Sequence, residues 1–176
     1  TVARLVFAGG DVIEPLVTRP SNGSAEGDRK QGTTVRVWPD AKYFESSQLP
    51  MAELTHLLRS KAVLMPGVSV TLTHEKTRDV QTWLYKGGLR DYLMQTLAAD
   101  PVIPLFEGEG FADGQHDSFA EGEGAAWCLA FTEEGAAVRE SYVNLIPTSA
   151  GGTHELGLRD GVFNAVKSFI DLHSLL

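Results

Sequence analysis

The 176-residue sequence predicts a chain of the α+β class. Two observations favour this class: segments that alternate apolar and polar residues occur in pairs around short turns, and other segments carry apolar residues at helical spacing. The composition is typical of a globular protein, with 43% hydrophobic and 22% charged residues. A chain of this length can bury about two-thirds of the surface that it exposes when unfolded, so it needs no disulfide or metal ion to hold a core.

The first half of the sequence is predicted to hold several strands and one helix. In order, the elements are a strand at 2–7, a turn at 8–11, a strand at 12–17, a polar surface loop at 18–31, a strand at 32–38, a helix at 50–65, and a hairpin with strands at 68–73 and 80–85. Pro50 suits the first turn of the helix, because proline lacks the N–H group that would have no partner there. Gly87 and Gly88 are the best candidates for a domain boundary.

The second half is predicted to hold two helices, a pair of strands and an acidic loop. The loop covers residues 100–124, which hold seven Asp or Glu, five Gly and no Lys or Arg. Trp127, Leu129 and Phe131 form one face of a strand, whose expected partner is 138–146. The short helix is expected at 89–97, and a long helix from about Thr153 carries the apolar stripe Leu158, Val162, Val166, Phe169, Ile170 and His173.

The charge balance and the single cysteine limit the classes of function. Lys plus Arg number 15 against 23 Asp plus Glu, a net charge of −8, which argues against a chain that coats nucleic acid over its whole surface. No apolar run approaches the roughly 20 residues of a membrane-spanning helix. Cys128 cannot form an internal disulfide, which fits a reducing cytoplasm. The sequence begins within a predicted strand and ends within a predicted helix, so we expect a piece of a longer polypeptide.

The motifs of common catalytic sites are absent from the sequence. It holds no G-x-x-x-x-G-K-[ST] phosphate loop, no G-x-S-x-G turn, no H-E-x-x-H pair and no C-x-x-C pair. The five His residues are scattered without the spacing of metal ligands, so the sequence argues against a metal site. Cys128 lies mid-strand, where a buried and unreactive thiol is expected.

Three features have both a functional and a structural interpretation. Gly151 and Gly152 precede the last helix and could present backbone N–H groups to an anion, although the sequence favours a tight turn in which Thr153 caps the helix. Arg159 either contacts a ligand or is a solvated helix charge. Thr33 either offers its hydroxyl to a polar ligand atom or serves only the β-propensity of its strand.

Three strings carry a resemblance to a known family. They are residues 32–40 (GTTVRVWPD), 61–68 (KAVLMPGV) and 140–148 (ESYVNLIPT), the last continuing through GGTH at 151–154 to GLR at 157–159. Together they resemble the B subunit of bacterial type IIA topoisomerases, over nearly the whole chain. Residues 140–147 and the Pro-Gly pair after Met65 are more similar to the topoisomerase IV type of B subunit than to the gyrase type.

The resemblance implies two consecutive parts of a larger fold. Residues 1–86 look like the C-terminal half of an ATPase domain of the GHKL type, which is an α/β sandwich. Residues 88–176 look like the start of a transducer domain, whose β-α-β fold is similar to that of ribosomal small-subunit protein five. Such transducers use a left-handed crossover, an exception to the usual right-handed rule. The strand that completes this fold is expected beyond Leu176.

The resemblance also implies ATP and Mg²⁺ as ligands of the complete protein, with most ligating residues outside this chain. The catalytic Glu, the metal-binding Asn, the glycine-rich lid and the loop that reaches the γ-phosphate have no counterpart here. No catalytic and no metal-binding residue is therefore assigned, and the chain alone is expected to lack ATPase activity. The residues carried over are Thr33 and Val35, at the adenine end, and Arg159, which is expected to face the central cavity of the ATPase dimer.

The implied function is that of a cytoplasmic, ATP-dependent type II topoisomerase, an isomerase that passes one DNA duplex through another. The expected partners are a topoisomerase IV A subunit and DNA, in a heterotetramer whose two B subunits dimerise through an arm absent here, with no membrane contact. The acidic segment 100–124 is not expected to touch DNA. Three alternatives stay open: a gyrase-type B subunit, a binding module without nucleotide function, and a hydrolase built around His154, Glu155 and Arg159.

Overall fold

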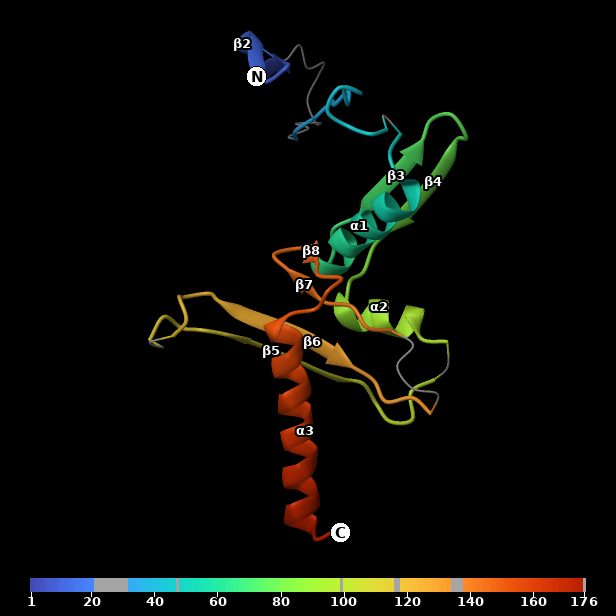
Figure 1. Cartoon of the computed structure of the whole chain (residues 1–176), viewed down its shortest axis with the longest axis vertical. Coiled ribbons are helices and arrows are strands. Elements are labelled where there is room, and N and C mark those ends of the chain that lie inside the picture. Colours follow the sequence, from blue (N-terminus) through green and yellow to red (C-terminus); the bar gives the residue numbers. More distant parts are fainter. Residues whose placement is uncertain (21–31, 47, 99, 116–117, 134–137, 176) are drawn as a thin grey trace. The chain divides into compact units, whose positions relative to one another are not determined.

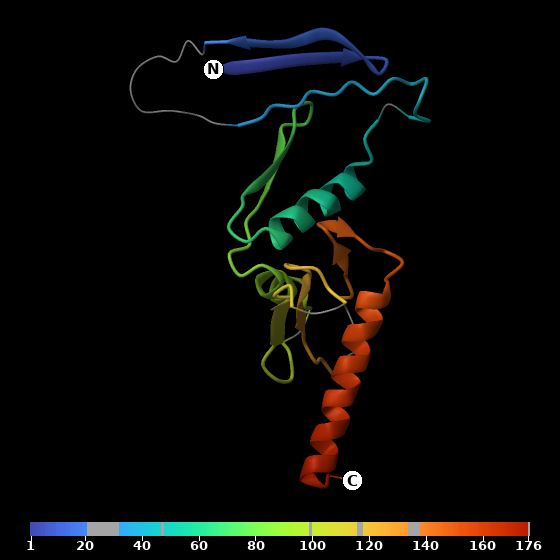
Figure 2. The same ribbon diagram turned by 90° about the vertical axis from the view of Figure 1, so that its left-hand side faces the viewer.

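The computed structural model of the chain describes residues 1–20, 32–46, 48–98, 100–115, 118–133 and 138–175. These residues hold three helices and eight strands, and the strands form four two-stranded antiparallel sheets (Figure 1 and Figure 2). The mixture of helices and strands that the sequence predicts is therefore confirmed. The chain divides into two compact units, Thr1–Ser47 (unit 1) and Gln48–Leu176 (unit 2).

Unit 1 begins with a hairpin, as the alternating pattern predicts. β1 (Val2–Ala8) pairs with β2 (Asp11–Arg19), and the register places Ala8 opposite Asp11. Gly9 and Gly10 form the turn with φ angles of 61° and 95°, a region that residues with a Cβ rarely adopt. The two glycines are therefore what allows so short a connection. Most of the polar loop predicted at 18–31 lies outside the described residues.

The strand predicted at 32–38 is not formed, because these residues have no regular secondary structure. Val35 and Trp38 expose 77% and 79% of their surfaces, so neither face of the expected alternation is buried. A strand needs a neighbour whose backbone groups complete its ladder, and no described residue pairs with this segment. Alternation of apolar and polar residues is typical of strands, but it does not supply the partner that a strand needs. The prediction of a strand at 32–38 is therefore wrong.

Unit 2 opens with the helix and the hairpin that the sequence predicts. Helix α1 (Met51–Leu64) starts directly after Pro50, whose carbonyl accepts a hydrogen bond from the Leu54 N–H at 3.0 Å. The hairpin of β3 (Val70–His74) and β4 (Asp79–Trp83) follows, and β3 lies against α1. Both predictions are confirmed, because a helix and a hairpin find their hydrogen-bond partners close by in the sequence.

The buried core of unit 2 joins α1 to α2 (Leu89–Thr96), the short helix predicted after the glycine pair. The ring of Tyr85 meets that of Tyr92 edge-on, with centroids 5.7 Å apart. The buried hydrophobic residues among those described are Ala62, Val63, Tyr85 and Tyr92, with Val70, Trp83 and Leu89 packed against them. The domain boundary expected at Gly87 and Gly88 lies within unit 2 and stays a prediction.

The acidic segment 100–124 is not a loop throughout, which corrects the prediction. It contains β5 (Phe106–Phe111) and the first residue of β6 (Gly124–Leu129), and the two strands pair with Gly108 opposite Trp127. A Cβ on Gly108 would lie 2.7 Å from the Trp127 ring, so glycine here makes room for the indole. Pairing depends on the backbone of a partner strand, which the polarity of these side chains does not reveal.

The single long strand predicted at 138–146 is also wrong. β7 (Tyr142–Val143) and β8 (Ile146–Pro147) pair with each other and not with β6. The turn residues Asn144 and Leu145 have φ angles of 47° and 69°, as in the two-residue turns that favour hairpins. A turn in the middle of the segment therefore replaces the continuous strand.

Helix α3 (Thr153–His173) confirms the long helix, but its apolar stripe is at most partly covered. None of its residues is buried, and Phe169 exposes 56% of its surface. The periodicity of the stripe predicts the helix correctly, because helical hydrogen bonds are internal to the segment. It does not determine whether a partner covers the apolar face.

Candidate functional site

The residues expected at the adenine end of a nucleotide lie in unit 1. Thr33 and Val35 are both exposed and belong to the segment without regular structure. Side chains two residues apart share a side in a strand, and no strand is formed here, so the structure does not place the Thr33 hydroxyl beside Val35. Arg159 belongs to unit 2, and the structure does not join the three residues in one site.

Arg159 lies in the second turn of α3 at the edge of a cavity of about 440 Å³. Its side chain is exposed and makes no hydrogen bond or ion pair with a described residue. The cavity is lined by α2, β6, the segment before β7, β7 and α3, and its polar groups include those of Tyr92, Glu140, Tyr142 and Glu155. Arg159 is therefore a cation without a hydrogen-bond partner among the described residues, and its charge also helps to lower the pKa of Glu155.

The start of α3 supports the structural interpretation of the glycine pair. Gly152 precedes the helix in the capping position, so the predicted cap by Thr153 is wrong. Gly151 has a φ angle of 73°, and a Cβ there would lie 2.6 Å from a carboxylate oxygen of Glu155. Glu155 stands in the first turn, where the helix dipole favours negative charge. The Gly151 N–H donates to the Thr148 carbonyl, so the glycines serve the turn before the helix, and Glu155 lies close to Gly151.

Glu155 is held in place by an ion pair with Arg139. The Arg139 guanidinium donates a hydrogen bond to the Glu155 carboxylate. This hydrogen bond, with the positive charge of Arg139, lowers the pKa of Glu155 below its ordinary value. The segment before β7 is thereby tied to the first turn of α3.

A network of hydrogen bonds around Glu140 connects α1, α2 and β7. The Tyr92 hydroxyl donates to Glu140 Oε1 at 2.6 Å, and the Tyr142 hydroxyl donates to Glu140 Oε2. On its other side, the Tyr92 hydroxyl accepts a hydrogen bond from Arg59 Nη2 at 3.0 Å. Tyr92 exposes only 5% of its surface, so its hydroxyl depends on these partners for hydrogen bonding.

The network changes the acidity of both tyrosines. Burial, then the hydrogen bond to Glu140 and its negative charge, raise the pKa of Tyr92 from 10.0 to about 12, against an opposing effect of Arg59. The same causes raise the pKa of Tyr142. Both phenols therefore stay protonated at neutral pH and act as donors to the carboxylate.

We expect the stability of unit 2 to fall as the pH rises from about 10 towards about 12. Tyr92 has a pKa above its unfolded value, so its contribution is fully present below pH 10 and is lost as the pH approaches the folded pKa of about 12. The measurement is the free energy of unfolding against pH, for the wild type and for Tyr92→Phe. An equal alkaline loss in both proteins would show that Tyr92 is not its source.

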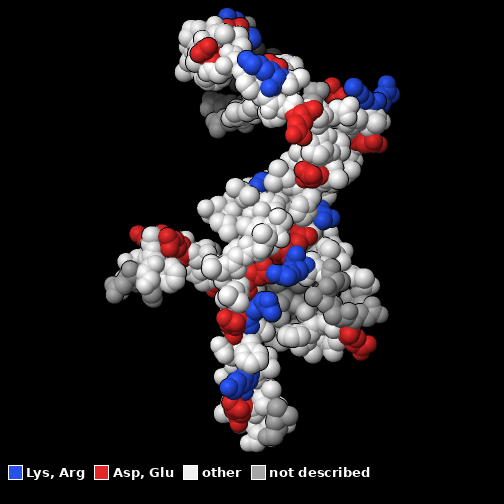
Figure 3. Space-filling view, in the orientation of Figure 1, with Lys and Arg blue, Asp and Glu red and all other residues white. Residues whose placement is uncertain are grey.

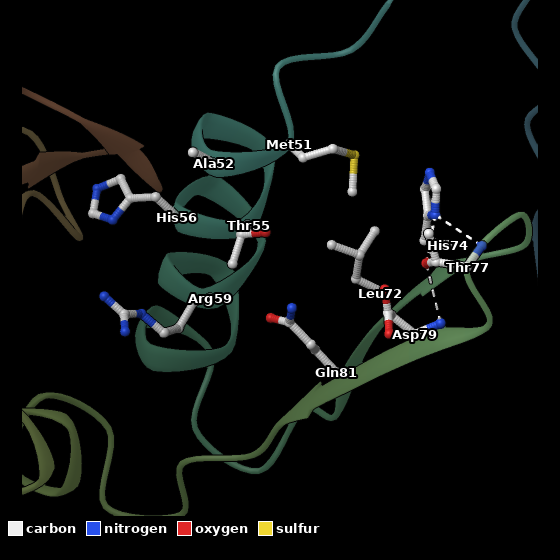
Figure 4. A pocket seen from close by; sticks show the side chains of 10 residues that line it. All are labelled: Met51, Ala52, Thr55, His56, Arg59, Leu72, His74, Thr77, Asp79 and Gln81. Carbon is white, nitrogen blue, oxygen red and sulfur yellow. Dashed lines mark hydrogen bonds between the residues drawn. The ribbon is translucent and has the colours of Figure 1, made fainter.

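A second cavity, of about 590 Å³, lies between α1 and the β3–β4 hairpin (Figure 4). Met51, Leu72 and Gln81 extend into the space between helix and hairpin. The His74 imidazole is engaged in the hairpin turn, with 2.7 Å between its Nδ1 and Thr77 Oγ1. The lining mixes apolar and polar side chains and indicates no particular ligand.

Other features of the described residues limit the chemistry further. No group of three or more His, Cys, Asp or Glu residues there could hold a metal ion, and no helix there could cross a membrane. Burial, then the negative charge of Glu107, raise the pKa of Cys128, so its thiol is a poor nucleophile. On the face shown in Figure 3, Lys and Arg do not form one continuous patch over unit 2.

Sequence reasoning missed the role of the Glu140 network. The sequence patterns single out neither Tyr92 nor Arg59, and Glu140 only belongs to a string that carries the family resemblance. A tyrosine on the buried stripe of a helix is a usable signal, because its hydroxyl needs a partner. The sequence contains no signal for which carboxylate supplies it.

The comparisons with known proteins all point to one family. Residues 88–176 match the family model described as DNA gyrase B. The chain is 42% identical over 151 residues to the B subunit of DNA topoisomerase 4 from Pseudomonas aeruginosa, a match that covers 85% of this chain and 23% of the relative. It is 36% identical to the B subunit of DNA topoisomerase 4 from Escherichia coli, covering 99% of this chain and 26% of the relative.

Two further matches are more distant. The B subunit of DNA gyrase from Haloferax volcanii is 31% identical over 150 residues, covering 82% of this chain and 22% of the relative. The solved ATP-binding domain of Francisella tularensis topoisomerase IV, in complex with a small-molecule inhibitor, has a TM-score of 0.58 and 25% identity, covering 98% of this chain and 44% of that structure. The chain spans about a quarter of the length of the curated relatives.

Proposed function

Because this chain belongs to the DNA gyrase B family, we propose that it forms part of the ATP-binding B subunit of a topoisomerase IV. The observation that carries the proposal is the match of residues 88–176 to the family model, which the relatives extend over nearly the whole chain. The identity is higher to the topoisomerase IV relatives, at 42% and 36%, than to the gyrase relative, at 31%. This difference favours topoisomerase IV over gyrase.

The two predicted parts of the fold belong to this proposal. Residues 1–86 are the C-terminal part of the GHKL ATPase domain, and residues 88–176 are the first part of the transducer domain. The start of the family match at residue 88 supports this division. The single long helix α3, after a pair of hairpins, is compatible with a transducer of the β-α-β type.

The complete protein would couple ATP binding and hydrolysis to the passage of one DNA duplex through another. Its partners would be a topoisomerase IV A subunit, a second B subunit and DNA, in the cytoplasm. The resemblance to the family places the metal ligands and the catalytic residues in the rest of the protein. The contribution of this chain to nucleotide binding is then limited to Thr33 and Val35.

The test of the proposed function uses the full-length B subunit that carries this sequence, mixed with its A subunit. We expect decatenation and relaxation of DNA that require ATP. The A subunit or the B subunit alone is the control and should pass no strand. Supercoiling of relaxed DNA by the mixture would identify a gyrase, and DNA passage that does not depend on ATP would contradict the proposal.

We expect Thr33→Val in the full-length protein to weaken ATP binding by about 0.5–1.5 kcal/mol, the usual net value of one hydrogen bond. The Val side chain keeps the shape and the β-propensity of Thr33, so only the hydroxyl is lost. Calorimetric titration with a non-hydrolysable ATP analogue measures the effect. Thr34→Val is the matched control, because it removes the same hydroxyl from the neighbouring residue, which is not expected to contact ATP. If the wild type, Thr33→Val and Thr34→Val bind the analogue with equal affinity, the Thr33 hydroxyl does not bind ATP.

A further inference from the structure

Helix α1 is held at two places to the segment that the family model matches. Arg59 Nη2 donates to the Tyr92 hydroxyl at 3.0 Å, and the guanidinium lies 5.1 Å from the centre of the Tyr92 ring. Lys61 donates a hydrogen bond to the backbone carbonyl of Leu145 in the β7–β8 turn. The two donors precede residue 88 and the two acceptors follow it, so these contacts bridge the start of the matched segment.

The acceptor of the second contact is itself an unusual backbone position. Leu145 has a φ angle of 69°, which is costly for a residue with a bulky side chain. Such a conformation persists where the surroundings hold it in place. The hydrogen bond from Lys61 is one such contact, and β8 also lies against α1.

Glu140 lies at the centre of the first contact. Its two carboxylate oxygens accept hydrogen bonds from tyrosines on different elements, Oε1 from Tyr92 on α2 and Oε2 from Tyr142 on β7. Hydrogen bonds to a charged acceptor are stronger than neutral ones, and two of them fix the direction of the carboxylate. The position of α2, and through Arg59 that of α1, is thereby set relative to β7.

The residue next to Glu140 continues the connection to α3. Arg139 pairs with Glu155, which stands in the first turn of α3. Arg139 and Glu140 are adjacent in the chain, so one short segment contacts α2 on one side and α3 on the other. A displacement of α1 would therefore be passed to α3 through hydrogen bonds and an ion pair, which have fixed directions. Apolar contacts would transmit it less well, because apolar surfaces can slide over one another.

We propose that Glu140 is a positioning residue that couples the movement of α1 to that of β7 and α3. The inference rests on the proposed function, in which α1 belongs to the ATPase domain and α3 to the transducer. In the complete protein, Glu140 would transmit the state of the nucleotide site towards the DNA-passing machinery. Without its hydrogen bonds, the protein would still hydrolyse ATP, but fewer of the hydrolysis events would lead to the passage of a DNA strand.

The experiment measures the number of ATP molecules hydrolysed per DNA strand passage, with the full-length B subunit and its A subunit. Glu140→Gln keeps the shape of the side chain and removes one of its two acceptor oxygens. Tyr142→Phe removes one donor and keeps the ring. Each variant is expected to raise the ratio by about two- to tenfold, which corresponds to the net value of one hydrogen bond, with the KM for ATP unchanged.

Glu107→Gln is the matched control. Its carboxylate pairs with Arg90 at 3.0 Å in the same unit, about half of both side chains is exposed, and neither residue contacts the Glu140 network. The ratio of this variant should equal that of the wild type. The melting temperature of each variant verifies that the protein is folded, and if Glu140→Gln fails to fold, Tyr142→Phe decides the question alone.

Two outcomes overturn the inference in different ways. If hydrolysis and strand passage fall in parallel in the Glu140 and Tyr142 variants, or if Glu107→Gln raises the ratio equally, Glu140 serves the local structure only. If the wild-type protein performs no ATP-dependent strand passage, the proposed function itself is wrong, and the coupling is refuted with it.

Discussion

Tyr92→Ala is expected to lower the free energy of unfolding of unit 2 by about 3–5 kcal/mol, the usual cost of deleting a buried large aromatic side chain. Tyr92 is one of the few buried residues that join α1 to α2, and its ring packs edge-on against Tyr85. The truncation also removes the hydroxyl that lies between Arg59 and Glu140. Denaturation with urea, followed by circular dichroism, measures the loss.

Phe163→Ala is the matched control for this truncation. Phe163 lies on α3 and exposes 67% of its surface, so its removal leaves no cavity in the described core. We expect a change of less than about 0.5 kcal/mol, as for other exposed substitutions. If the two variants lose equal stability, the core of unit 2 is not centred on Tyr92.

Arg159→Gln in the full-length protein is expected to reduce DNA-stimulated ATP hydrolysis and strand passage by at least about tenfold. A hydrogen bond to a charged group is worth about 1.5–3 kcal/mol, and a DNA phosphate is such a group. Arg159 is exposed, has no hydrogen-bond partner among the described residues, and stands beside a polar cavity, so its five donors are available. Hydrolysis is measured with and without DNA, and strand passage by relaxation of supercoiled DNA.

The same variant should bind ATP and fold as the wild type does. Lys167→Gln is the control, because it removes a positive charge about two turns further along the same helix. Relaxation at the normal rate by Arg159→Gln would make Arg159 a solvated helix charge. Loss of the fold would instead show that it is a partner in a structural ion pair.

The sequence predicted those elements whose backbone partners lie nearby in the chain. Helices α1, α2 and α3 form their hydrogen bonds internally, and the hairpins β1–β2 and β3–β4 close across short turns. Apolar periodicity and turn residues such as Gly9 and Gly10 are therefore sufficient evidence for them. The strands that alternation predicted at 32–38 and 138–146 are not formed, because a strand also needs a partner strand, and the alternation of residues does not show which segment that is.

The candidate site divides in a similar way. The strings in the sequence identified the family and singled out Thr33, Val35 and Arg159, because a resemblance is carried by residue types in order along the chain. Their surroundings did not follow from it. The sequence does not show that Glu155, at the start of α3, pairs with Arg139, because the two residues lie on different segments.

The sequence by itself therefore determined the family, the three helices and the two local hairpins, since each depends on residues close together or on the order of residue types along the chain. Only the tertiary structure decided that β5 pairs with β6 and that Tyr92 donates to Glu140, a residue 48 positions away. Packing of α1 against α2 brings those polar groups together, and burial of the Tyr92 ring makes its hydroxyl depend on them. The sequence shows which polar and apolar groups are present, whereas the fold determines which of them are in contact.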